Sequence, residues 1–147
     1  MTERVALQRR TAFAAAVLMV FSLLTGIFVS AAMTGKVNAD PHSALASHLN
    51  ALLGSLWIMA VCVTIPWLRY SITGCRRLVA LLIVANVSNW VVTAVKAFWH
   101  VAGVDKTGDA QNDIIFGLLT ALVVLPSLGA AVGWAYGLLG PAPMAES

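Results

Sequence analysis

Charge is scarce in this chain of 147 residues, of which 10% are charged and 60% are apolar. A soluble domain carries about 25% charged residues, because its surface has to be covered with groups that water solvates. The mean hydropathy of +0.87 leaves too little polar surface for that. The composition therefore excludes a soluble globular protein, and the length predicts a single domain over residues 1–147.

Cysteine and acidic residues are also few, and their positions exclude two kinds of chemistry. The two cysteines, Cys62 and Cys75, fall in an apolar segment and in a predicted loop, so no disulfide framework is expected. Four of the acids lie in or beside loops: Asp40, Asp105, Asp109 and Asp113. The apolar segments therefore contain no carboxylate pair for acid–base hydrolysis. The chain has no P-loop, dinucleotide-binding, zinc-protease or nucleophile-elbow motif.

Four long apolar segments make up most of what is present, at about residues 11–33, 44–68, 78–104 and 114–139. A helix needs about 20 apolar residues to cross a hydrocarbon core of ~30 Å. Ser43 is the expected N-cap of the second segment. The sequence thus predicts an all-α fold, an integral membrane four-helix bundle in contact with membrane lipid.

The distribution of arginine and lysine predicts the orientation of this bundle. Three arginines precede the first segment, and three lie in the connection between the second and third segments. The other two connections hold one lysine each. The positive-inside rule then places both termini in the cytoplasm. The expected location is the cell inner (plasma) membrane, with multiple passes. This bias accounts for the basic pI of about 9.2, so no nucleic-acid binding is inferred.

Polar residues inside the apolar segments are the candidates for chemistry, since such residues are costly in a bilayer and usually face the bundle interior. The third segment has five of them at one helical face: Asn86, Asn89, Thr93, Lys96 and His100. The second has His48 and Asn50, with Ser55 seven residues after the histidine. We expect a polar pocket here, and we expect His48 and His100 to face each other across it.

Purely structural explanations of these residues remain open. Asn89 is equally consistent with a hydrogen bond that joins two membrane helices. Lys96 has the length to extend its ammonium group to the interface, and His100 beside Trp99 fits an interfacial belt.

The fourth segment contains small residues at intervals of four, Gly129, Gly133 and Gly137. This spacing lets helix backbones approach closely, either within one chain or between subunits. Pro126 in the middle of the same segment is expected to kink the helix.

Four short motifs occur along the chain: L-L-T-G at 23–26, L-A-S-H-L at 45–49, I-P-W-L-R-Y-S at 65–71, and N-W at 89–90 followed by Trp99 and Gly103. In this order they resemble the motifs of the hydroxylaminobenzene mutases and the related styrene oxide isomerases. The resemblance covers roughly residues 9–140.

This resemblance implies an intramolecular isomerase that acts on a small apolar aromatic substrate, either an aryl epoxide or an aryl hydroxylamine. It implies ferric haem b as a Lewis acid at the subunit interfaces of a homotrimer, with His48 as the iron ligand. Asn89 would orient the substrate oxygen, with Lys96 and Asn50 as further catalytic candidates. Ser55 and Trp90 are the further candidates for contact with the haem.

The chain departs from the family pattern at four positions. Gly54 stands where an asparagine is usual, Asn50 where the mutases have glutamate, and Thr93 and Ala85 where the epoxide isomerases have tyrosine and aspartate. Lys96 is a possible local replacement for one of these lost polar groups.

Two other functions compete with the isomerase hypothesis. One is an electron carrier whose haem is held by both His48 and His100. The other is a non-catalytic membrane subunit, in which the polar face serves only to hold helices together.

Overall fold

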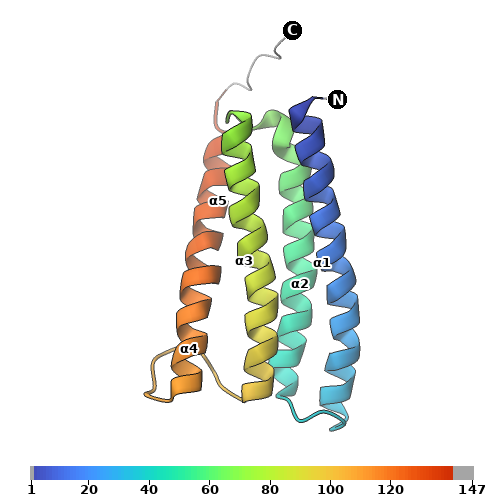
Figure 1. Cartoon of the computed structure of the whole chain (residues 1–147), viewed down its shortest axis with the longest axis vertical. Coiled ribbons are helices and arrows are strands. Elements are labelled where there is room, and N and C mark those ends of the chain that lie inside the picture. Colours follow the sequence, from blue (N-terminus) through green and yellow to red (C-terminus); the bar gives the residue numbers. More distant parts are fainter. Residues whose placement is uncertain (1, 141–147) are drawn as a thin grey trace.

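The computed structural model describes residues 2–140 and consists of four long helices (Figure 1). They are α1 (Glu3–Met33), α2 (Pro41–Thr64) with the short 3-10 helix η1 (Ile65–Trp67), α3 (Ile72–Trp99), and a fourth helix built from α4 (Ala110–Leu118), the π-helix η2 (Leu119–Val124) and α5 (Leu125–Leu138). Each of the four is long and apolar enough to cross a membrane. The predicted all-α fold with four membrane-length helices is confirmed.

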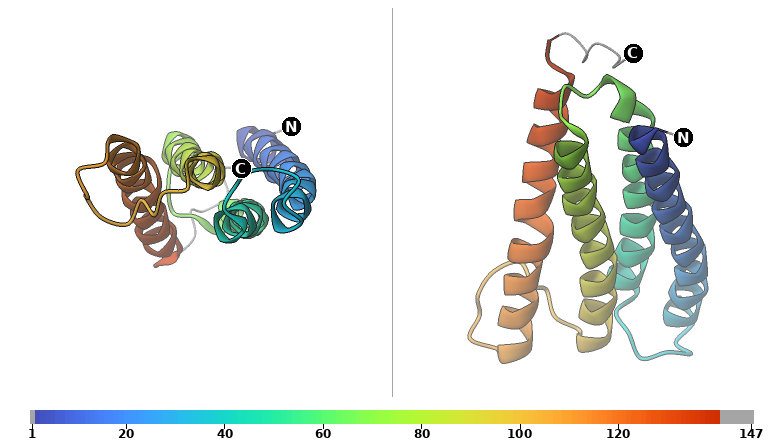
Figure 2. Two further views of the ribbon diagram at one scale, coloured as in Figure 1. Left: turned by 90° about the horizontal axis from the view of Figure 1, so that it is seen from below. Right: turned by 45° about the horizontal axis from the view of Figure 1, so that its top comes forward.

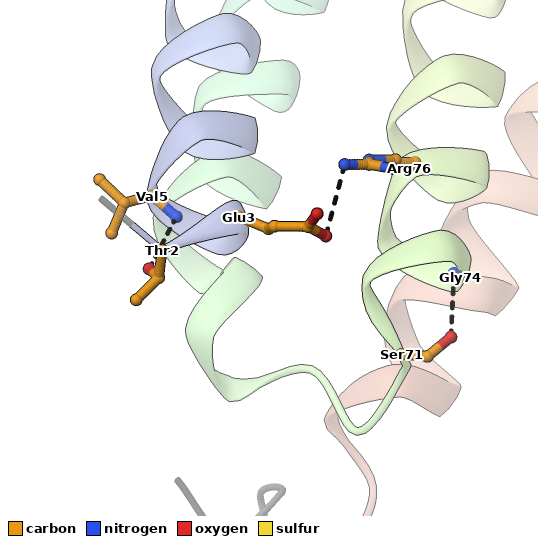
Figure 3. Close-up of polar contacts among 6 residues, drawn as sticks. All are labelled: Thr2, Glu3, Val5, Ser71, Gly74 and Arg76. Carbon is orange, nitrogen blue, oxygen red and sulfur yellow. Dashed lines mark hydrogen bonds and ion pairs between the residues drawn. The ribbon is translucent and has the colours of Figure 1, made fainter. Parts of the chain in front are cut away.

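The helices begin and end at different residues than the hydropathy pattern predicts. α3 begins six residues earlier, at Ile72, because the Ser71 hydroxyl accepts a hydrogen bond from the Gly74 N–H at 3.3 Å and caps it (Figure 3). Cys75 therefore lies in the first turn of α3, where it is buried, and not in a loop. Asp40, not Ser43, is the N-cap of α2, since its carboxylate accepts from the Ser43 N–H at 2.8 Å.

The four helices form a bent row and not a closed bundle (Figure 2). α1 packs along α2, α2 packs along α3, and the fourth helix packs mainly along α3. The helices run roughly parallel to one long axis. At one end of this axis lie the first residue of α1, the 68–71 connection and the last residue of α5 (Figure 1). That end holds six arginines and one glutamate within the described chain, whereas the other end holds three lysines and four aspartates.

The small residues of α5 pack within the chain. Of the three glycines Gly137 has the least space, because a Cβ atom there would be 2.7 Å from the Tyr70 ring. Gly133 and Gly129 face Leu78 and Leu81 of α3 in the same way. The Tyr70 hydroxyl also donates a hydrogen bond to the Gly133 carbonyl oxygen at 2.7 Å. The glycine spacing thus serves the packing of the fourth helix on α3 and its N-terminal connection.

Pro126 follows directly on the π-helical turn. The Leu125 N–H bonds to the Thr120 carbonyl oxygen, five residues before it, where an α-helix would bond four residues back. Because proline has no N–H and its ring crowds the preceding turn, this wider turn accommodates it within a continuous helix.

Candidate functional site

His48 lies on the flank of α2 that faces α1. Its Nδ1 is 2.8 Å from the backbone carbonyl oxygen of Ser22. A carbonyl oxygen only accepts hydrogen bonds, so Nδ1 carries a proton, and in the neutral imidazole Nε2 then has a free lone pair. The Ser22 hydroxyl donates in return to the His48 carbonyl oxygen at 3.0 Å. Within residues 2–140, Nε2 has no hydrogen-bond partner, and the partly exposed ring lies beside Gly26.

Asn50 and Asn89 meet on the flank of α2 that faces α3. The Asn50 side-chain N–H₂ donates to the Asn89 Oδ1 at 3.0 Å and to the Thr93 hydroxyl at 3.1 Å. The Thr93 hydroxyl lies 3.4 Å from the same Asn89 oxygen. With its oxygen held by two donors, the Asn89 amide presents its nitrogen, which makes no hydrogen bond in the part of the chain that the structure describes. Asn50 and Asn89 are both partly exposed, so this N–H₂ group is accessible.

Gly54 and Asn86 form a close contact that reasoning from the sequence missed. A Cβ atom at Gly54 would lie 2.7 Å from the Asn86 Oδ1 and 3.0 Å from its Cβ. Asn86 is 6% exposed, and its side-chain N–H donates to the Leu82 carbonyl oxygen at 2.8 Å. The space next to α2 at position 54, where the resemblance expects an asparagine, is thus filled by a carboxamide from α3. The signal in the sequence was the pairing of an unexpected glycine with an additional asparagine on the next helix.

Ser55 and Trp90 take part in the packing of α1. The buried Ser55 hydroxyl donates to the Leu52 carbonyl oxygen at 2.7 Å and lies 3.8 Å from the Met19 sulfur. The Trp90 indole N–H donates to the Thr25 hydroxyl at 3.0 Å. Ser55 thus shares the α1-facing flank with His48, whereas Trp90 links α3 to α1.

Lys96 and His100 line a different cavity, at the end of the bundle that carries the lysines. This cavity of about 410 Å³ is also lined by Asp40, His42 and Ser43. His48 is not among its lining residues, so the expectation that His48 and His100 face each other is wrong. α3 ends at Trp99, and His100 caps it in the left-handed conformation with φ 52°, so the predicted polar face ends at Lys96. Within one protomer, this cavity therefore gives no support to an electron carrier with these two ligands.

The Asp40 carboxylate, which lines this cavity, caps the N-terminus of α2. The hydrogen bonds from the hydroxyl and backbone N–H of Ser43 hold the pKa of Asp40 below its usual 3.8. Asp40 is therefore ionised at neutral pH, and its backbone N–H bonds to the Ala97 carbonyl oxygen at 2.8 Å, which ties the α1–α2 connection to α3.

The side chains of the site can supply one ligand to a haem iron, but they cannot surround a bare metal ion. Within the described residues, no group of three or more histidine, cysteine or acidic side chains could hold a bare metal ion. A haem iron needs only one or two ligands from the protein, because the porphyrin nitrogens supply four. A single imidazole with Nδ1–H bonded to a backbone carbonyl and Nε2 free fits that need.

Four membrane-length helices, one anchored imidazole and a network of amides within the apolar bundle define a small multi-pass membrane protein with a polar site. The sequence model of the styrene oxide isomerase family matches residues 7–139. The chain belongs to this family, and it is a membrane isomerase of the styrene oxide isomerase type. No curated protein and no solved structure matches it.

Proposed function

We propose that this protein converts a small aryl epoxide into its carbonyl isomer, with ferric haem b held by His48. The family membership supports the reaction type, and an aryl hydroxylamine is the second substrate class to test. The observation that carries the assignment of His48 is the 2.8 Å contact of its Nδ1 with the Ser22 carbonyl oxygen. That hydrogen bond fixes the ring and directs the proton-free nitrogen away from the α1 backbone.

The proposed reaction is internally balanced. Isomerisation of an epoxide to an aldehyde breaks one C–O bond and moves one hydride to the neighbouring carbon, so no water, oxidant or second substrate is consumed. When bound, ferric haem supplies a Lewis acid that polarises the substrate oxygen without net electron transfer. The apolar helices exclude water, and an apolar aromatic substrate enters between them from the lipid.

Asn89 is the proposed partner of the substrate oxygen. Its amide nitrogen offers two N–H donors, and an epoxide oxygen only accepts hydrogen bonds. Asn50 and Thr93 hold the Asn89 oxygen, so they act as positioning residues that fix which end of the amide faces the substrate. Fixed donors aimed at an oxygen that gains negative charge typically contribute about 10²–10³ in rate. Lys96, about two helical turns after Asn89 along α3, makes no hydrogen bond to this network within residues 2–140 and lines the separate cavity.

The two parts of the site lie on opposite flanks of α2. His48 and Asn50 are two residues apart, which is a rotation of roughly 200° around the helix. We propose that a homotrimer unites them, so that His48 of one protomer and the partner subunit's Asn89 face the same substrate. This arrangement also keeps the partly exposed Asn50 and Asn89 amides away from lipid.

The visible absorption spectrum of the full-length protein in detergent tests this function, before and after addition of hemin. We expect a Soret band in the wild type and in His42→Ala, the matched control at the exposed start of α2. His48→Ala should lose the band and reduce aryl epoxide turnover to the uncatalysed rate. Full turnover by a folded His48→Ala variant, or wild-type turnover without haem, would contradict the proposal. If the protein converts an aryl hydroxylamine faster than an aryl epoxide, the hydroxylamine is its substrate class.

A further inference from the structure

The outward face of α1 at the arginine-rich end carries two arginines at adjacent positions, Arg9 and Arg10. Ala6, Arg9, Arg10 and Phe13 are spaced at 0, 3, 4 and 7, which places them on one face of the helix. Together they line a hollow of about 400 Å³. Both arginines are exposed, and Phe13 is 70% exposed, so this face is turned away from the bundle.

Other arginines at this end have partners within the protein. Arg4 donates to the Tyr70 carbonyl oxygen at 2.6 Å, Arg69 to that of Leu139 at 3.3 Å, and Arg76 to the Glu3 carboxylate at 3.5 Å (Figure 3). Arg9 and Arg10 make no hydrogen bond or ion pair within residues 2–140. Glu3 is the single acid at this end of the described chain, and it faces Arg76. The hollow thus offers positive charge that nothing in this part of the protein neutralises.

The position of the hollow along α1 fixes its depth in a membrane. Residues 11–33 carry no charge, and at 1.5 Å per residue they span roughly 35 Å, enough for the hydrocarbon core. Arg9 and Arg10 directly precede this stretch, so their side chains lie at the level of the lipid phosphates. Phe13, one turn further, reaches the boundary with the acyl chains, where aromatic rings are favoured.

We propose that this hollow binds the phosphodiester headgroup of an anionic phospholipid. Guanidinium groups pair with phosphate oxygens through two parallel N–H···O bonds, and two of them line this hollow. The phosphate lies between Arg9 and Arg10, and Phe13 packs on the first carbons of the acyl chains. A lipid with a cationic headgroup adds a charge of the wrong sign, and a free phosphate gains nothing from Phe13. This inference is independent of the proposed isomerase function.

Native mass spectrometry of the full-length protein in detergent tests the site by lipid titration. The probes are phosphatidylglycerol and phosphatidylcholine with the same acyl chains. The double variant Arg9→Gln/Arg10→Gln removes both charges and keeps a good helix former at each position. Arg77→Gln is the matched control, since Arg77 is exposed at the same end and is not among the residues that line this hollow. Thermal unfolding of each variant verifies that the fold is retained.

We expect the wild type to bind phosphatidylglycerol more tightly than phosphatidylcholine. A juxtamembrane arginine contributes about fivefold to such binding, so the double variant should weaken it ~30-fold. Arg77→Gln should stay within about twofold of the wild type, and Phe13→Ala should weaken binding of the lipid. An unchanged affinity in the double variant would overturn the proposal, as would an equal loss in Arg77→Gln. Displacement of the lipid by equimolar glycerol 1-phosphate would also overturn the proposal, because it would show that the hollow binds a soluble phosphate.

Discussion

The two flanks of α2 hold their polar groups in different ways. Towards α1, His48 is oriented by a backbone carbonyl, and the Ser22 hydroxyl bonds to backbone in return. Towards α3, the side chains of Asn50, Asn89 and Thr93 hydrogen-bond to one another and, within residues 2–140, to no backbone group. A ring fixed by backbone keeps its orientation when neighbouring side chains change, whereas a side-chain network loses its order when one member is removed. The first arrangement suits a metal ligand, and the second suits an amide whose direction selects the substrate.

Removal of Asn89 tests the α3-facing flank without changing the α1-facing flank, and after His48→Ala it has the largest expected effect. Asn89→Ala should lower kcat/KM for the aryl epoxide about 10²-fold and leave the Soret band unchanged, because the donors to the substrate oxygen are lost while the His48 contacts remain. Steady-state kinetics and absorption spectra of the same sample measure both. A Soret band lost along with activity would show that the two flanks are not separable.

Asn50→Leu sharpens the same comparison, since Asn50 is expected to act through Asn89. The single variant should lose about tenfold in kcat/KM, because the Asn89 amide can then rotate and present its oxygen. In an Asn89→Ala background the same substitution should change almost nothing. Additive losses in this double-mutant cycle would rule out a positioning role for Asn50.

Gly54→Ala tests how closely α2 and α3 approach at the contact between Gly54 and Asn86. The new Cβ would overlap with Asn86, and overpacking of this kind costs about 1–3 kcal/mol. Unfolding in a denaturing detergent should show this loss, and Gly54→Ala/Asn86→Ala should recover most of it. Gly117→Ala is the control in another helix, because a Cβ there meets nothing within 4 Å. Equal stability of Gly54→Ala and wild type would mean that the helices separate easily at this point.

Asp40→Ala, at the end of the bundle, should have the smallest effect, about 1 kcal/mol from the loss of an N-cap. Asp40→Asn keeps the capping oxygen and should cost little. Because the folded protein lowers the pKa of Asp40, its ionised form contributes stability above pH 3.8, and this contribution is lost as the pH falls through the lowered value. The difference in unfolding midpoint between wild type and Asp40→Ala should thus shrink in acid. A difference that stays constant with pH would assign the stabilisation to the uncharged hydrogen bond alone.

The apolar composition was sufficient to predict the number of helices, since a membrane admits few other folds for such a chain. The helix ends were predicted less well, because residues 72–77, with Gly74, Arg76 and Arg77, looked like a loop while the Ser71 cap extends α3 through them. The same reasoning placed His100 in the helix, although a left-handed residue ends α3 there.

The sequence by itself determined the four membrane-length helices, the gathering of the arginines at one end and the polar residues available for a site. It also carried the motifs of the styrene oxide isomerase family. Only the tertiary structure decided which polar groups meet: His48 with the Ser22 carbonyl, Asn50 with Asn89, and Asn86 in the space beside Gly54. In a membrane helix the lipid-facing and protein-facing sides are both apolar, so periodicity does not distinguish them. The contact partners then follow from packing and from the pairing of each polar group within the bundle.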